Sequence, residues 1–395
     1  MRVAIFIDSR YRDTLGCLLV KKRLQQLRKD WDILAVSIDL WQQVMQLYRP
    51  HVVILNHAIG YRNKEIISRA KYSIVLPTEG RPNTREQEDW YVTEQDGVAD
   101  LYLSWNQLIA DKLKKAKAVV TGCPRFDIYH DHKDKIDSKI KARAKYGLDQ
   151  SRQTIGVFTS YPQAKFAFQK TQFNQQDWKD LGVDKISTRS NPLEFAQSEY
   201  AERQKFMNAI SVLHDVFPEY QLLVKPHPME DVIEIQKWCD ERGFTCVTQD
   251  TIFNVVAACD VVVNRIGCIT TIDSWLSGVP VISFGTPEDD GLAAESNEFC
   301  YDALELLEAF QCDYPNADIS YMETCGVTEP ATERVARAIV ENAPVYNDVL
   351  ETKNRVLLQK VIQEHGWHNT ALNLNDGQVG KAATIGYINS WESAL

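Results

Sequence analysis

The sequence predicts an α/β protein with two consecutive domains, each built on a doubly wound parallel sheet. Short β-branched apolar runs alternate with amphipathic stretches of helical period, and this alternation stops near residue 130 and resumes near residue 154. Continuous apolar runs are typical of strands covered on both faces, and strand–helix–strand alternation is typical of parallel sheets. The chain has 395 residues, which is too long for one ordinary core and suits two domains.

The first domain is predicted over residues 1–150. Its expected strands are 3–7, 33–37, 52–56, 73–76 and 118–121, and its expected helices are 18–28, 40–47, 64–70 and 107–113. Residues 128–152 break this rhythm with a charged stretch that contains few apolar positions, so we expect a surface helix and a linker there.

The second domain is predicted over residues 151–345. Its expected strands are 154–159, 220–224, 245–248, 261–264 and 279–284, and its expected helices are 199–216, 232–242, 270–277 and 332–342. The polar segment 161–198 is expected to be a long excursion of the chain between the first strand and the first helix of this domain. Residues 346–395 are expected to form C-terminal helices that pack back towards the first domain.

Composition excludes several classes of protein. Apolar residues make up 44% and charged residues 25%, and the formal net charge is −10. The first two values are typical of a globular protein, and the acidic balance disfavours a general nucleic-acid binder. The nine cysteines show no CxxC spacing, so we expect small buried side chains in a reducing compartment and no metal site.

No stretch reaches the length of about 18 apolar residues that a membrane span needs. The first apolar run ends at Asp8 and is too short for a signal peptide. We therefore expect a cytoplasmic protein. Any contact with the cytoplasmic face of the inner membrane is expected to be peripheral, through assembly proteins or a lipid-linked acceptor.

A cation and an imidazole follow one expected strand of the second domain directly, in Lys225-Pro226-His227-Pro228. Two prolines hold the backbone around the histidine extended. Ligands of such sheets bind at the carboxyl ends of the strands. This segment therefore favours neutralisation of a phosphate leaving group; a simple strand-to-helix turn is the alternative.

A second segment places a glycine turn between an expected strand and helix. Arg265 and Gly267 follow the strand, and Thr270 and Thr271 open the helix. A helix N-terminus, two hydroxyls and a guanidinium suit a phosphate. Ordinary capping by threonine is the alternative. Asp273 is expected either to accept from a ribose hydroxyl or to complete a capping box.

Three further segments follow expected strands. Two such domains leave a cleft between the carboxyl ends of their sheets. Glu79, held by Gly80, is in the position of a general base facing this cleft, with a solvent-facing turn as the alternative. Ser160 offers a hydroxyl to a phosphate or a sugar. Arg125 and Asp127 are expected to pair with each other as a clamp between the domains.

Several common nucleotide signatures are missing from the sequence. No GxGxxG separates a strand from a helix and no GxxxxGK[ST] is present, which disfavours a dinucleotide enzyme and a P-loop ATPase. The one DxD triplet, Asp30-Trp31-Asp32, enters the second strand from its amino end, away from the cleft. We therefore expect neither a metal nor a cofactor.

The order of these motifs resembles a known group. Thr78-Glu79-Gly80, 122–127 (GCPRFD), 159–162 (TSYP), Lys225 to Pro228, and 267–280 with its Thr pair and Gly-Val-Pro are similar to bacterial surface-carbohydrate biosynthesis proteins, polysialyltransferases, and capsule and O-antigen Kdo transferases. The resemblance spans about residues 1–290. It implies the GT-B fold, two Rossmann-like domains that face each other across a cleft, and CMP-activated acidic sugars as donors.

The resemblance also implies roles for individual residues. Glu79 is the general base for the acceptor hydroxyl, His227 assists the departure of CMP, and Thr270 with Thr271 holds the CMP phosphate. This sequence has Thr78 where the family often has a first acid, and Thr-Thr where it commonly has Ser-Ser or Ser-Thr.

Retaining chemistry offers a second mechanism. Some Kdo transferases of this type resemble enzymes with a carboxylate nucleophile, and Glu230 or Asp231 would supply it here. A helix cap is the alternative for Asp231.

The expected function is transfer of a CMP-activated ulosonic acid, Kdo or a sialic-acid-like sugar, to a surface polysaccharide or lipid-linked glycan. Lys225 and Arg265 are candidates to bind the sugar carboxylate. The alternatives are a CDP-glycerol-type glycerophosphotransferase, a non-catalytic carbohydrate-assembly protein of the same fold, and a UDP-sugar epimerase-like enzyme.

Overall fold

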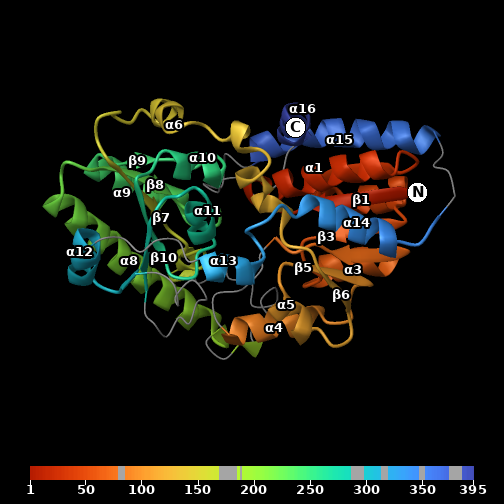
Figure 1. The fold of residues 1–395 in the computed structure, drawn as a ribbon, viewed down its shortest axis with the longest axis horizontal. Helices are drawn as coiled ribbons and strands as arrows, with labels where there is room; N and C mark the ends of the chain where they lie inside the picture. The colour runs from red at the N-terminus through yellow and green to blue at the C-terminus, as the bar shows by residue number, and fades with distance from the viewer. Residues whose placement is uncertain are drawn as a thin grey trace.

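The computed structural model describes residues 1–78, 85–168, 185–186, 189–285, 298–312, 319–346, 352–372 and 385–395. These residues form two sheets, each of six parallel strands, with helices on both faces (Figure 1). The predicted α/β class with two Rossmann-like domains is confirmed. Among the described helices, none combines the length and apolar character that a membrane crossing requires.

The first sheet has the order β2-β1-β3-β4-β5-β6. Its strands are β1 (Arg2–Ile7), β2 (Asp32–Ser37), β3 (Val52–Leu55), β4 (Tyr72–Val75), β5 (Leu101–Ser104) and β6 (Lys117–Val120). Every described pairing is parallel. The chain leaves β1 for β2 on one side and returns to β3 on the other, so the topological switch point lies between β1 and β3.

Helices cover both faces of this sheet. They are α1 (Arg10–Leu27), α2 (Trp41–Gln43), α3 (Tyr61–Arg69), α4 (Arg85–Gln95) and α5 (Gln107–Lys112), with a 3-10 turn at Ile38–Leu40 and a π-helix at Val44–Tyr48. α1 begins at Arg10 rather than at the expected residue 18. Its N-cap is Ser9, whose amide donates to the Asp13 carboxylate at 2.8 Å, so the polar residues after β1 start the helix instead of forming a loop.

Two 3-10 helices, Pro124–Tyr129 and Lys133–Lys135, and α6 (Lys139–Lys145) connect the domains. The second sheet has the order β12-β11-β10-β7-β8-β9. Its strands are β7 (Thr154–Phe158), β8 (Gln221–Lys225), β9 (Thr245–Cys246), β10 (Val261–Arg265), β11 (Val281–Phe284) and β12 (Glu298–Cys300). Its switch point lies between β7 and β10.

The helices of this half include one that starts earlier than expected. They are α8 (Pro192–Val216), α9 (Val232–Arg242), α10 (Ile252–Ala257), α11 (Thr270–Leu276), α12 (Ala303–Gln311) and α13 (Ile319–Cys325), with a 3-10 turn at Ala164–Phe166. α8 begins at Pro192, because Asn191 accepts two backbone N–H groups as its N-cap and proline suits the first helical position.

The last three helices lie on the first domain. α14 (Thr332–Asn342) packs on α1, α15 (Thr352–Leu372) on the π-helix, and α16 (Ile385–Ala394) on α1 and β2. α14 falls within the range 151–345 expected for the second domain. It contributes Val335, Ala336 and Ile339 to the apolar core of the first domain.

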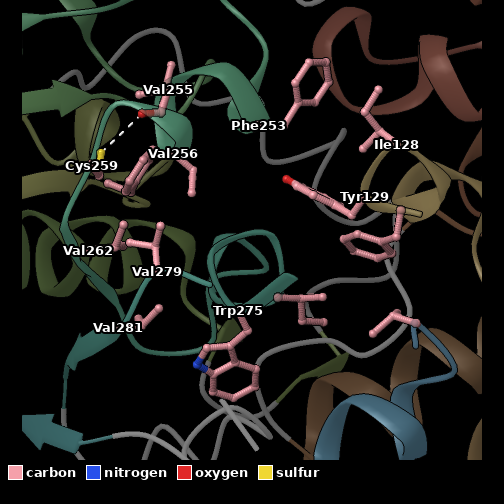
Figure 2. Close-up of a cluster of buried hydrophobic side chains, with 14 of the residues drawn as sticks. Ile128, Tyr129, Phe253, Val255, Val256, Cys259, Val262, Trp275, Val279 and Val281 are labelled. Carbon is pink, nitrogen blue, oxygen red and sulfur yellow. Dashed lines mark hydrogen bonds between the residues drawn. The ribbon is translucent and has the colours of Figure 1, made fainter. Parts of the chain in front are cut away.

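One apolar cluster runs through both domains. Ile128 and Tyr129 of the connector lie among Phe253, Trp275 and other side chains of the second domain (Figure 2). Leu15 and Leu19 of α1 belong to the same cluster. The two sheets are therefore held in place by shared buried apolar surface and not by the connecting chain alone.

All nine cysteines are described, and none of them forms a disulfide. Cys17, Cys123, Cys239, Cys259, Cys300 and Cys325 are buried, Cys246 and Cys268 are partly buried, and Cys312 is exposed. Most therefore fill the core, as expected from the apolar runs in which they occur.

Candidate functional site

The carboxyl ends of strands from the two sheets face each other across the domain boundary. Lys225, the last residue of β8, places its Nζ atom 5.6 Å from the ring centroid of Tyr11, in the first turn of α1. Arg125, which follows β6, bonds to Asp273 of α11. Ligands of doubly wound sheets bind beyond these strand ends.

Lys225 is the most unusual group at this boundary. Its side chain is 6% exposed, and its Nζ atom is buried with no hydrogen-bond partner. Burial lowers the pKa of Lys225 to about 8, against the opposing charge of Asp250. A buried ammonium group without a partner is costly, so the position favours an anionic ligand.

The turn after Lys225 fixes the tautomer of His227. The Nδ1 atom of His227 accepts from the backbone N–H of Met229 at 3.2 Å. An accepting Nδ1 carries no proton, so the neutral imidazole has its proton on Nε2. In this tautomer Nε2 is the ring atom that carries the donor proton.

Glu230 holds this turn against the neighbouring loop after β7. Its carboxylate accepts from the N–H of His227 at 2.7 Å, from the N–H of Tyr161 at 3.2 Å, and from the hydroxyl of Thr159. The side chain is fully buried, and burial raises its pKa. Glu230 therefore joins two strand ends, with both carboxylate oxygens already bonded.

Asp231 is the N-cap of α9. Its Oδ1 atom accepts from the N–H groups of Ile233 and Glu234 at 3.1 and 3.2 Å. Asp231 thus forms the helix cap that was expected as the alternative to a catalytic role. Its catalytic assignment stays a prediction.

Arg265, at the end of β10, forms hydrogen bonds inside the second domain through its Nη1 atom. Its Nη1 atom donates to the carbonyl of Ser160 at 2.6 Å and to Glu199 at 2.7 Å. Its guanidinium also lies 4.6 Å from the ring centroid of Tyr161. Arg265 and Ser160 therefore lie together, as parts of one network at the β7–β10 switch point.

The turn into α11 contains the remaining expected phosphate-binding residues. Gly267 has φ +74°, a conformation that glycine adopts without strain. Thr270 and Thr271 are the first two residues of α11 and are buried. The hydroxyl of Thr271 accepts from Asn264 at 2.9 Å, so it fastens α11 to β10. Phosphate binding by this pair stays a prediction.

The expected pair between Arg125 and Asp127 is wrong. Arg125 bonds to Asp273, which also accepts from the hydroxyl of Tyr129 at 2.8 Å. Asp127 accepts the backbone N–H groups of Ala331 and Thr332 at 2.8 and 2.7 Å, at the start of α14. The side chains of Arg125 and Asp127 thus bond to different elements. Asp273 forms no capping box, because the N-cap of α11 is Ile269 and makes no side-chain capping bond, whereas a ribose contact by Asp273 stays a prediction.

On the first domain, Glu79 and Gly80 lie outside the described residues. Thr78, directly before them, is 6% exposed and lies three residues after the end of β4. Asp8, after β1, bonds to Arg62 at 3.1 Å. Asp32 is the first residue of β2, so the DxD triplet lies at the amino edge of the sheet, as expected.

Sequence reasoning missed two residues of the site. Tyr11 and Glu199 are single polar or aromatic residues within helical stretches, and no local motif marks them. Tyr11 lies against Lys225, which is 214 residues away in the chain, and Glu199 bonds to Arg265, which is 66 residues away.

A pocket of about 580 Å³ lies elsewhere in the fold. Lys139, Asp260 and Gly278 line it, next to the connector and near the amino end of β10. It contains none of the expected site residues. Within the described ranges, no group of three or more histidine, cysteine, aspartate or glutamate side chains is arranged to hold a metal ion.

Comparison with known proteins identifies the fold. No protein-family model matches the chain, and no curated protein matches its sequence. Among solved structures, MnaA from S. aureus, solved with UDP, superposes with a TM-score of 0.54 at 11% identity, covering 86% of this chain and 96% of that one.

Two other structures are similar to a comparable degree. The wall teichoic acid polymerase TagF has a TM-score of 0.52 at 9% identity, with 87% of this chain and 88% of that one covered. The UDP-GlcNAc 2-epimerase from Neisseria meningitidis has a TM-score of 0.50 at 12% identity, with 86% and 99% covered. The chain has the GT-B fold. At these identities the likeness shows the fold alone.

Proposed function

We propose that this chain is a glycosyltransferase that moves a CMP-activated ulosonic acid, Kdo or a sialic-acid-like sugar, to a surface polysaccharide or lipid-linked glycan. The observation that carries the proposal is the buried Nζ atom of Lys225, which has no partner at the boundary between two Rossmann-like domains. An anionic leaving group there would satisfy its charge.

His227 supports the same assignment. Its Nδ1 atom accepts from the N–H of Met229, so the neutral ring carries its proton on Nε2, two residues along the chain from Lys225. A hydrogen bond from Nε2 would stabilise the charge that develops on the phosphate as the bond to the sugar breaks. Gly267, Thr270 and Ser160 border the same strand ends and remain candidates to hold the nucleotide.

The choice of donor rests on the order of motifs. Glu79-Gly80, His227-Pro228 and Thr270-Thr271 occur in the order of the polysialyltransferase-like proteins, which generally use CMP-sugars. Glu79 is proposed as the general base. Asp231 is the weaker candidate for the carboxylate, because its Oδ1 atom caps α9.

A CDP-glycerol-type glycerophosphotransferase is the second candidate. One structure with this fold is the wall teichoic acid polymerase TagF, and Lys-Pro-His-Pro also occurs in proteins of the CDP-glycerol type. In both candidates Lys225 and His227 would bind the phosphate of a cytidine nucleotide. The group that the nucleotide carries, a sugar or glycerol phosphate, therefore distinguishes them.

The test is a thermal-shift titration with CMP, CDP, UDP and GDP, on the wild type, His227→Ala and the surface control His132→Ala. A ligand at 100 times its Kd adds about 2.7 kcal/mol to the stability of the folded state. We expect a shift with CMP that is lost in His227→Ala and kept in His132→Ala. Turnover of CMP-Kdo, CMP-sialic acid and CDP-glycerol is then measured directly.

Preference for UDP or GDP would reject the cytidine donor and favour the epimerase-like alternative. CDP-glycerol turnover without CMP-sugar turnover would favour the glycerophosphotransferase. Absence of binding by every nucleotide would favour a non-catalytic assembly protein.

A further inference from the structure

The N-terminus of α1 lies at the switch point of the first sheet. Only Asp8 and Ser9 separate β1 from this helix of 18 residues, and β3 pairs with the other side of β1. Ser9 is the N-cap but makes no side-chain capping hydrogen bond. The N-terminus of a helix carries partial positive charge and attracts anions, phosphate groups in particular.

Lys225 points at this helix end from the other domain. Its Nζ atom lies 5.6 Å from the ring centroid of Tyr11, the second residue of α1, and is buried without a partner. Arg10, the first residue of α1, has its guanidinium 5.4 Å from the same ring. One tyrosine ring is thus flanked by cations from both domains.

The carboxylates nearby are already neutralised. Asp8 bonds to Arg62 at 3.1 Å, and Asp13 bonds to Arg12 at 2.5 Å. Asp250, the acid in charge interaction with Lys225, is held by Lys145 and Tyr146 at the end of α6. No described carboxylate therefore satisfies the Lys225 ammonium through a hydrogen bond.

We propose that the N-terminus of α1, with Arg10, and Lys225 bind one phosphate group between them, so that the ligand joins the two domains. The ligand class is a phosphate monoester or diphosphate. Its identity as the phosphate of the donor nucleotide rests on the proposed function, whereas the anion site does not. Tyr11 would position the Lys225 ammonium by lying against it.

The experiment is isothermal titration of the full chain with CMP and, separately, with inorganic pyrophosphate. The proteins are wild type, Arg10→Gln, Lys225→Met and the double variant. Arg28→Gln, at the other end of α1, and Lys237→Met, an exposed lysine of α9, are matched controls. Arg10→Glu is added because an acid in the first turn favours the helix while reversing the charge.

We expect each single substitution to weaken binding about tenfold, as charge-assisted bonds to phosphate do. The double variant should lose less than the product of the two, since both groups contact the same phosphate. Arg10→Glu should remain folded and bind more weakly than Arg10→Gln. The controls should bind within twofold of wild type.

Three results separate the two-domain phosphate site from the proposed function. CMP binding that depends on Lys225 and not on Arg10 would refute the two-domain phosphate site and leave the proposed function standing. Pyrophosphate binding that depends on both residues, without binding of any nucleotide, would keep the site and reject the nucleotide donor. Absence of binding by every probe would reject both.

Discussion

Arg125 and Asp273 form a buried ion pair across the domain boundary, between the loop after β6 and the helix α11. Their side chains are 8% and 1% exposed, and the hydroxyl of Tyr129 donates to the same carboxylate at 2.8 Å. The pair lies beside the turn that holds Thr270, so it fixes α11 relative to the first domain.

Asp273→Asn should lower the free energy of unfolding by about 3 kcal/mol or more, because it leaves the Arg125 guanidinium buried without a counter-charge. Urea unfolding followed by circular dichroism measures the change. The control is Asp215→Asn, which breaks an exposed pair with Arg242 and should cost at most about 1 kcal/mol. Equal losses in the two variants would contradict a buried clamp.

Much of the fold follows from local pattern. The strand expected over 261–264 is observed as Val261–Arg265, because a continuous β-branched run suits a strand covered on both faces. β5 was missed, since Leu101–Ser104 has only four residues and no β-branched run.

The site likewise contains residues that the sequence predicted and contacts that it could not predict. Lys225 was placed correctly at a strand end, since the apolar run before it marks the strand. The partner of Arg125 was not predictable, because Asp273 is 148 residues away and the nearer Asp127 offers the same charge. The packing of the two domains determines which acid Arg125 contacts, and this packing cannot be predicted from the residues near Arg125 in the sequence.

Binding of CMP should weaken as the pH rises above about 8. Burial lowers the pKa of Lys225 to about 8 in the ligand-free protein, so the ammonium that attracts the phosphate is lost above this pH. Affinity should be about tenfold lower at pH 9 than at pH 7. Titration calorimetry from pH 6.5 to 9.5 measures this, and Lys225→Arg should show no such loss, since arginine stays charged.

Stability should respond to pH in the opposite sense. The unfolded chain holds the Lys225 proton up to the ordinary pKa of 10.5, whereas the folded chain releases it near 8. The unfolded state therefore binds more protons in this window, and the contribution of Lys225 to stability rises with pH. Lys225→Met should remove this rise; an unchanged pH profile in that variant would show that another group causes it.

Asp231→Ser should keep transferase activity within about threefold of wild type, because serine replaces the cap of α9 while removing the carboxylate. Steady-state rates with the CMP-sugar that the wild type turns over measure this. A loss of a thousandfold with unchanged stability would instead identify Asp231 as the catalytic carboxylate.

Glu230→Ala should be far more disruptive to the fold. It leaves the N–H groups of His227 and Tyr161 and the hydroxyl of Thr159 without their acceptor. The expected loss is about 3 kcal/mol, as unsatisfied buried groups cost about 1 to 3 kcal/mol each and some regain water. Chemical unfolding measures it, and a loss below about 1 kcal/mol would show that the carboxylate does not hold the turn.

Arg265→Met should destabilise the protein by about 3 kcal/mol while changing CMP affinity less than threefold, because the Nη1 atom of Arg265 is bonded to Glu199 and the Ser160 carbonyl. Glu199→Leu in the same chain should restore part of the loss, since it removes the carboxylate that has lost its counter-charge, although the N–H of Gln163 then loses its acceptor. Unfolding curves and CMP titrations of both variants measure the two effects separately. A tenfold weaker affinity at nearly unchanged stability would show that Arg265 binds the nucleotide directly, and its bond to Glu199 would then hold the guanidinium in place for that contact.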